Sequence, residues 1–126
     1  MATAYVDTSV LLGVEFREAG WQSVTMRLAS FENLVAANLL EAEFRCALQR
    51  ESRPYDPALL AGIVWAIPGR SLEGEVGRVL EQGPLRGADC WHLAVALFLA
   101  GDPRTVTFLT LDQRQAAVAK RLGFRS

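Results

Sequence analysis

Two short apolar segments of the sequence each lead directly into an aspartate. Residues 3 to 7 read TAYVD, and residues 105 to 111 read TVTFLTL and are followed by Asp112. Short runs rich in Val, Thr and aromatic residues are typical of buried β-strands. A third run, LVAA at residues 34 to 37, predicts another buried strand. Short buried strands that alternate with helices favour a parallel sheet with helices on its faces.

Helical signals fill the segments between these strands. We predict a helix start at Thr8 and Ser9, and helices over residues 17 to 30, 38 to 50 with Asn38 as N-cap, 57 to 67 with Pro57 in the first turn, 72 to 82, 86 to 100, and 112 to 122 with Gly123 as the C′ residue. Residues 67 to 71, IPGRS, are predicted to be a connector or a weak strand. The order of elements predicts an α/β sandwich with both sheet faces covered. Ligands of such sheets bind beyond the carboxyl ends of the strands, where Asp7 and Asp112 are expected.

Length and composition indicate one globular unit. The chain has 126 residues, of which 51% are hydrophobic and 21% charged, so we expect a single domain over residues 1 to 126. The longest uninterrupted apolar run, residues 93 to 100, is much shorter than the ~20 residues that cross a bilayer. The N-terminus has no basic leader, so we expect a soluble, cytoplasmic protein without a membrane partner. Cys46 and Cys90 lack zinc-site spacing, and we expect both to be reduced thiols in the core.

Glu43 is the acid that is hardest to explain as a structural residue. Its neighbours three and four positions away on a helix include Leu40 and Ala47, so its carboxylate projects from the apolar face. Glu41 lies on the opposite face and has Arg45 four positions later, the spacing of an exposed ion pair. A buried carboxylate must be paired, protonated or bound to a metal. A buried pair with an arginine from elsewhere in the chain is the alternative to a metal site.

The other three acids each have an ordinary explanation when taken singly. Asp7 and Asp112 suit the N-cap position of a helix, and Asp89, in the first turn of the helix over residues 86 to 100, suits the helix dipole. A lone histidine on an apolar face is usually a core residue, so we expect a structural role for His92. One divalent-cation site explains all four acids together, and all-oxygen ligation favours Mg²⁺ or Mn²⁺. Such a site activates water and stabilises a phosphodiester transition state.

Four blocks of the sequence together resemble the PIN-domain ribonucleases, and most closely the toxin subunits of VapBC-type toxin–antitoxin pairs. The blocks are YVDTSVLL with Asp7, LLEAEFRCALQR with Glu43, LRGADCWHLAVAL with Asp89 and FLTLDQRQAAVAKRLGF with Asp112. They cover nearly the whole chain, in order. The resemblance implies a three-layer α/β/α sandwich around a central parallel sheet. It also implies an endoribonuclease that requires Mg²⁺ or Mn²⁺ and uses these four acids for catalysis and metal binding.

Further expectations follow from the same resemblance. Ser9 and Thr110 match small polar positions beside the first and last acids, and family members form homodimers that a cognate antitoxin inhibits. Attack by metal-activated water on RNA is expected to leave a 5′-phosphate and a 3′-hydroxyl. Arg86 and Arg114 lie near proposed acids and are candidate phosphate contacts, because a guanidinium matches phosphate oxygens. A solvated surface charge is the simpler explanation for each arginine. Cys90 and the tryptophan after it depart from the smaller residues usual at this place.

Other functions fit parts of the pattern. A phosphotransferase of the haloacid-dehalogenase type needs a second aspartate where this chain has Ser9. The presence of all four acids argues against a non-catalytic binding module of the same fold. A nuclease of the same fold that acts on DNA or in RNA maturation remains an open alternative.

The net charge of the chain has a different implication when the four proposed site acids are counted separately. The chain has 13 basic and 14 acidic residues and a net charge of −1, which excludes binding of nucleic acid by a basic stripe alone. Without the four proposed site acids, 10 acidic residues remain against 13 basic ones, and 12 of those 13 are arginines. We therefore expect an acidic, cation-binding pocket within a mildly basic surface.

Overall fold

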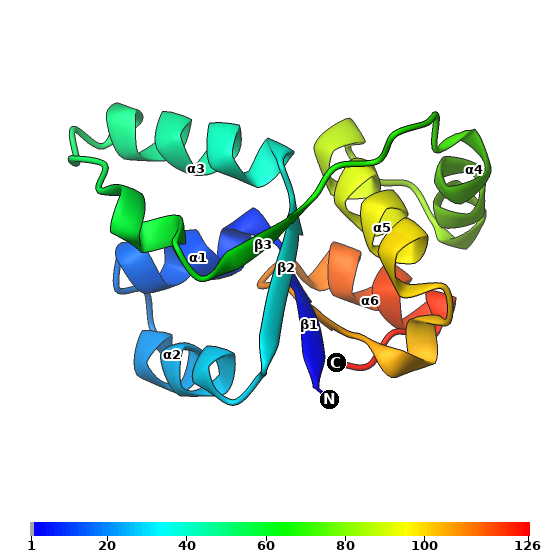
Figure 1. Ribbon diagram of the computed structural model, residues 1–126, viewed down its shortest axis with the longest axis horizontal. Coiled ribbons are helices and arrows are strands. Elements are labelled where there is room, and N and C mark those ends of the chain that lie inside the picture. Colours follow the sequence, from blue (N-terminus) through cyan, green and yellow to red (C-terminus); the bar gives the residue numbers. More distant parts are fainter. Residues whose placement is uncertain (1) are drawn as a thin grey trace.

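The computed structural model describes residues 2–126 and has a parallel β-sheet at its centre (Figure 1). The strands are β1 (Thr3–Val6), β2 (Asn33–Ala37), β3 (Ile63–Ala66) and β4 (Thr107–Leu109). They form a four-stranded sheet in the order β3-β2-β1-β4, and every pairing is parallel. The carboxyl ends of all these strands therefore meet at one edge of the sheet.

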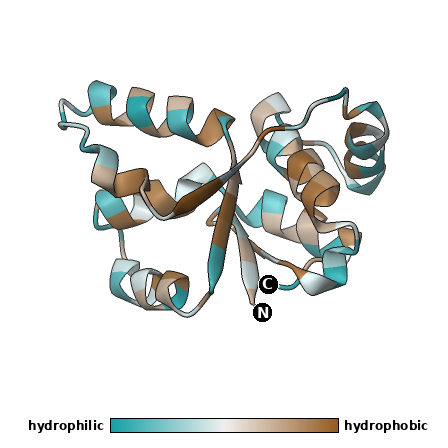
Figure 2. Ribbon diagram, in the orientation of Figure 1, coloured by the Kyte–Doolittle hydropathy of each residue, from teal (hydrophilic) through white to brown (hydrophobic). Residues whose placement is uncertain are grey.

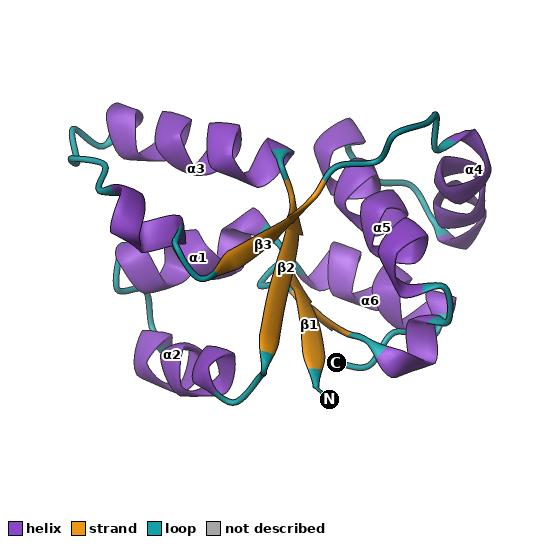
Figure 3. Ribbon diagram, viewed as in Figure 1, coloured by secondary structure: helices purple, strands orange, loops and turns teal. Residues whose placement is uncertain are grey.

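Helices cover both faces of this sheet, as Figure 3 shows. On one side lie α1 (Thr8–Glu15), α2 (Trp21–Ala29) and α3 (Leu39–Arg50), and on the other lie α4 (Glu73–Gln82), α5 (Gly87–Ala100) and α6 (Gln113–Leu122). The 3₁₀ turns η1 (Pro57–Leu60) and η2 (Pro103–Thr105) precede β3 and β4. The predicted α/β class and three-layer sandwich are confirmed. Among residues 2–126, no helix has the length and apolar character needed to cross a bilayer.

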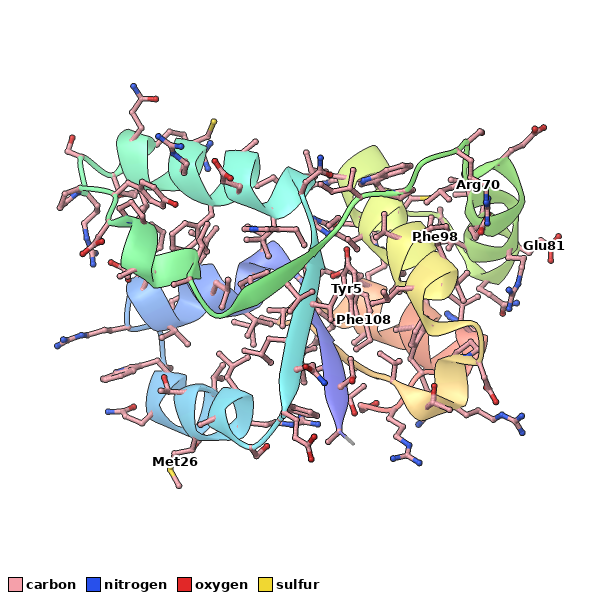
Figure 4. All side chains as sticks on the ribbon, viewed as in Figure 1. Tyr5, Met26, Arg70, Glu81, Phe98 and Phe108 are labelled. Atoms are coloured by element: carbon pink, nitrogen blue, oxygen red, sulfur yellow. The ribbon has the colours of Figure 1, made fainter. Side chains whose placement is uncertain are left out.

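Alternation along the strands builds a separate apolar core on each face of the sheet. Tyr5 and Val35 point toward α4, α5 and α6, whereas Ala4 and Val6 pack on the side of α1 and α2. Tyr5 and Phe108 lie at the centre of the molecule, where their rings stack with centroids 5.3 Å apart (Figure 4). Hydrophobic residues follow the strands and the middle of α5 (Figure 2). The two cores hold the carboxyl edge of the sheet in place from both sides.

The helix predicted over residues 57 to 67 is wrong. Asp56 caps only the short turn η1, and its carboxylate accepts a hydrogen bond from the Ala58 amide at 2.9 Å. Residues 63 to 66, Ile-Val-Trp-Ala, then form β3 and pair with β2. A short apolar run does not distinguish a strand from a buried helix, and here the pairing with β2 decides. The IPGRS segment after it is a connector, as predicted.

Several element ends also differ from prediction. The helix expected over residues 17 to 30 begins only at Trp21, because Gly20 adopts a φ of 85°. The strand expected over residues 105 to 111 is limited to Thr107–Leu109, because η2 takes up the residues before it. Asn38 occupies the N-cap position of α3 but makes no capping hydrogen bond within residues 2–126. Gly123 ends α6, as predicted, and adopts the left-handed conformation with φ at 106°.

The two cysteines differ from each other in burial. Cys90 is buried, as predicted, but Cys46 is exposed, so its assignment to the core is wrong. Cys46 lies one turn beyond Glu43 on α3, where both residues line an open pocket. That pocket leaves the thiol without a covering layer. Both cysteines are free thiols.

Candidate functional site

Asp7 and Asp112 follow neighbouring strands at the carboxyl edge of the sheet. Val6 of β1 is in register with Leu109 of β4, and the Asp7 amide donates to the Leu109 carbonyl at 2.9 Å. Each aspartate also caps a helix. Asp7 Oδ2 accepts from the Ser9 amide at 3.0 Å, and Asp112 Oδ1 accepts from the Gln115 amide at 2.8 Å. The capping role therefore holds for both, and it occupies one oxygen of each carboxylate.

Ser9 and Thr110 join the two strand ends. Their hydroxyl oxygens are 3.4 Å apart. Ser9 Oγ accepts from the Leu111 amide at 3.0 Å, and Thr110 Oγ1 accepts from the Asp112 amide at 3.0 Å. These bonds fix the turn that carries Asp112 against the start of α1.

Gln115 is a site residue that the sequence analysis missed. It is fully buried, and its Nε2 donates to Asp7 Oδ1 and to the Asp89 carbonyl, each at 3.2 Å. Its Oε1 accepts from the Thr110 hydroxyl at 2.6 Å. One amide side chain thus links α6 to β1 and α5. The signal in the sequence was an amide on the apolar face of α6, three positions before Val118.

Asp89 lies in the first turn of α5 and is only partly buried. No hydrogen bond to its carboxylate is present among residues 2–126. Burial raises the pKa of Asp89 above its ordinary value, and the nearby carboxylates of Asp7 and Asp112 raise it further. Asp89 is therefore the acid whose negative charge has the least compensation.

Glu43 projects inward from α3, as its apolar neighbours predicted, but its partner is not an arginine. Its Oε1 is 2.6 Å from His92 Nε2 and accepts from the Thr8 hydroxyl at 2.7 Å. Burial raises the pKa of Glu43, but the hydrogen bonds from His92 and Thr8 outweigh burial and hold this pKa below its ordinary value. Glu41 pairs with Arg45 at 3.2 Å, as predicted.

His92 is buried, as expected of a core residue, and it has a polar partner on each ring nitrogen. Nδ1 lies 3.0 Å from the Tyr5 hydroxyl, and Nε2 faces Glu43. Thr8 is likewise buried. These contacts with Glu43 were not predictable from local sequence patterns, because they join α1, α3 and α5 only in the folded chain.

Two adjoining pockets open beside these acids. Asp7, Glu43 and Asp89 line a cavity of about 470 Å³. Asp89 also lines the next cavity, of about 430 Å³, together with Asp112 and the two predicted arginines, Arg86 and Arg114. Both arginines are exposed and form no ion pair within residues 2–126. The structure thus places all eight predicted site residues around one region of the carboxyl edge.

The carboxylate side chains of the site are ligands that suit a cation preferring oxygen ligands. In residues 2–126, no group of three or more His, Cys, Asp or Glu side chains is placed to hold a metal ion. Mg²⁺ is commonly bound through only one or two carboxylates, with water and substrate phosphate as its other ligands. Asp89 is next to Asp7 and Asp112, and their mutual repulsion is the kind that a divalent cation relieves. These three aspartates, with Glu43, are the residues that would hold one.

Comparison of the chain with models of protein families, with curated proteins and with solved structures gives no match.

Proposed function

We propose that this protein is a divalent-cation-dependent endoribonuclease. The observation that carries the proposal is the placement of Asp7, Asp89 and Asp112 around adjoining pockets, where burial and the charges of Asp7 and Asp112 raise the pKa of Asp89. Acids so arranged at the carboxyl edge of a parallel sheet suit phosphodiester hydrolysis. The resemblance of the sequence to PIN-domain ribonucleases supports RNA as the substrate.

The side chains divide the work as follows. Asp7, Asp89 and Asp112 would hold Mg²⁺ or Mn²⁺, and Glu43 completes the site. When bound, the cation would act as a Lewis acid that activates water and offsets the charge of the transition state. Ser9, Thr110 and Gln115 keep the strand ends and the first turn of α6 in place. Their hydrogen bonds keep the aspartates in position before substrate binds.

Arg86 and Arg114 provide the phosphate contacts of the proposed enzyme. Both line the cavity that also contains Asp89 and Asp112. A phosphate in this cavity can accept hydrogen bonds from a guanidinium while its scissile bond lies near the acids. The arginines also offset part of the repulsion between the acids and the RNA backbone.

The cleavage test uses purified protein, a mixed RNA substrate and either Mg²⁺ or Mn²⁺. We expect cutting with each cation, loss of cutting in excess chelator, and products with 5′-phosphate and 3′-hydroxyl ends. Asp112→Asn is the decisive variant, because asparagine still caps a helix but carries no charge. It should abolish cutting while the fold survives, and the exposed Glu41→Gln should cut like wild type. Cutting by Asp112→Asn at the wild-type rate, or in excess chelator, contradicts the proposal.

The proposed biological role is that of a toxin held inactive by an antitoxin, and it rests on the same sequence resemblance. The proposal includes a homodimer and a cytoplasmic site of action. Expression of the chain in cells should arrest growth, and co-expression of the product of the neighbouring reading frame should relieve the arrest. Growth unaffected by a catalytically active chain contradicts the toxin role and favours RNA maturation. Preferential cutting of DNA favours the alternative substrate.

A further inference from the structure

His92 is the single histidine of the chain, and it lies in a buried row of hydrogen bonds that reaches the candidate site. The row begins at the backbone of β2, where the Ala37 amide donates to the Tyr5 hydroxyl oxygen at 3.0 Å. The Tyr5 oxygen is 3.0 Å from His92 Nδ1, and His92 Nε2 is 2.6 Å from Glu43 Oε1. Two strands, β1 and β2, and two helices, α3 and α5, thus contribute to one line of polar contacts.

The donors in this row determine where the ring hydrogen of His92 lies. Tyr5 has one hydroxyl hydrogen, and its oxygen already accepts from Ala37. The hydroxyl hydrogen therefore points at His92 Nδ1, which accepts it. The ring hydrogen must then be on Nε2, from which it is donated to Glu43. With the hydrogen on Nδ1 instead, the Tyr5 hydrogen loses its acceptor, and a bare ring nitrogen faces the carboxylate.

Both hydrogen bonds to Glu43 fall on the same oxygen. Oε1 receives the Nε2 hydrogen of His92 and the Thr8 hydroxyl hydrogen. Oε2 accepts no hydrogen bond within residues 2–126. The side chain is 32% exposed and lines the cavity that it shares with Asp7 and Asp89. Oε1 is therefore the anchored oxygen, and Oε2 is the oxygen available to the cavity.

We propose that His92 is a positioning residue whose Nε2 hydrogen, held there by Tyr5 and Glu43 together, anchors Glu43 through Oε1 and leaves Oε2 for the contents of the cavity. The importance of this for catalysis rests on the proposed nuclease function, but the hydrogen-bond arrangement does not. An ordinary core histidine needs only satisfied ring nitrogens. This one connects the backbone of β2 to an acid of the candidate site.

The first test is a ¹⁵N NMR spectrum of protein labelled on histidine, at neutral pH and without metal. One histidine gives one pair of ring nitrogens, so the signals need no assignment among residues. We expect a single species with hydrogen on Nε2 and with Nδ1 as an acceptor. Hydrogen on Nδ1, or an average between the two forms, overturns the proposal.

Variants that keep the shape of each partner test the two hydrogen bonds of His92 separately in the same spectrum. Tyr5→Phe should move the Nδ1 resonance toward that of a ring nitrogen without a hydrogen bond and leave the hydrogen on Nε2. Glu43→Gln should move the signal of the Nε2 hydrogen, because the acceptor loses its charge. Glu41→Gln, on the exposed face of the same helix, should change neither signal. An Nε2 hydrogen that is unmoved in Glu43→Gln overturns the contact.

The second test measures RNA cleavage by two His92 variants. His92→Leu removes the donor and should lower kcat by ~10–100-fold with little change in KM, the usual scale for residues that orient a metal ligand. His92→Gln can donate to Glu43 through its amide and should recover part of the loss. A folded His92→Leu protein with wild-type kcat overturns the positioning role. A wild-type protein that cuts no RNA overturns the proposed function, whereas a ring hydrogen on Nδ1 overturns the role of His92 alone.

Discussion

Two groups of acids at the candidate site have opposite electrostatic surroundings. On the glutamate side, formed by Thr8, Glu43 and His92, two hydrogen bonds lower the pKa of the acid. On the aspartate side, formed by Asp7, Asp89 and Asp112, burial and neighbouring charges raise the pKa of Asp89. One acid is therefore stabilised by the protein in its charged form, and the other is not.

This difference indicates where the proposed cation would be most stabilising. A carboxylate that already has donors gains little from further neutralisation, whereas one beside two other acids gains much. The aspartate side is thus the place where Mg²⁺ or Mn²⁺ would bind most favourably. On the glutamate side, hydrogen bonds to Oε1 already hold Glu43 in place, and Oε2 accepts no hydrogen bond within residues 2–126.

The largest expected effect comes from removing the uncompensated charge. Asp89→Asn should lower RNA cleavage by ~100-fold or more, the scale on which loss of one preorganised electrostatic group slows an enzyme. Thermal stability should stay the same or rise, because the charge is disfavoured in the fold. Cleavage rates and melting curves of the same preparation check both effects. Wild-type activity in Asp89→Asn removes the distinction between the two sides.

The next largest effect concerns Gln115, which supports the aspartate side alone. Gln115→Leu leaves Asp7 Oδ1 and the Thr110 hydroxyl without a buried partner and should lower the free energy of unfolding by about 2 kcal/mol. Urea denaturation measures this loss. Gln113→Leu, at an exposed position of the same helix, is the matched control and should stay within about 0.5 kcal/mol of wild type. Equal stability of the two variants contradicts the supporting role.

A smaller effect is expected at the arginines beside the aspartate side. Arg114→Ala should raise KM for RNA about fivefold and leave kcat nearly unchanged, because an exposed phosphate contact contributes about 1 kcal/mol. Arg121→Ala, near the other end of α6, is the control for a general loss of positive charge. Steady-state kinetics at low salt measure the difference. Equal KM values for the two variants assign Arg114 to the solvated surface.

The smallest expected effect is on the free energy of unfolding of the metal-free protein. Removing the charge of Asp89 and removing the charge of Glu43 should change it in opposite directions. The pKa of Asp89 is raised in the fold, so its charge destabilises the protein at neutral pH, and this penalty disappears as the pH falls through the raised pKa. The pKa of Glu43 is lowered, so its contribution is present above about pH 4.5 and is lost as the pH falls through the lowered pKa.

Asp89→Asn should therefore raise the free energy of unfolding at pH 7, and Glu43→Gln should lower it. Each change should be below about 1 kcal/mol, because water screens both partly exposed groups. Denaturation curves in chelator between pH 4 and pH 7 test the signs. Changes of the same sign in both variants contradict the comparison.

Much of this arrangement was predictable from the sequence. Asp7 and Asp112 end segments whose residue types indicate strands, and parallel pairing brings strand ends to one edge. Glu43 was recognisable because its helix neighbours are apolar. These inferences depend on local periodicity and on one general rule of α/β folds.

The remainder depended on contacts that local patterns do not contain. Residues 63 to 66 form a strand because β2 is beside them, and the same four residues are too short to show a period. His92 and Glu43 meet only because α3 and α5 lie at the same edge of the sheet. Gln115 lies on the apolar face of its helix, but the sequence does not show which groups its amide contacts. Tertiary partners, rather than propensity, decided each of these cases.

The pairing of β1 with β4 has a consequence for how the protein is made. Ala4 pairs with Thr107, so β1 gains this neighbour only after β4 has been synthesised. Asp7 is translated before Asp112 and Gln115, which join it only after β4 and the start of α6 have been made. A contact between positions so far apart in sequence requires closure of a long loop, which slows its formation. A nascent chain that lacks β4 and α6 therefore has no assembled site, and the proposed nuclease would be inactive at that stage of synthesis.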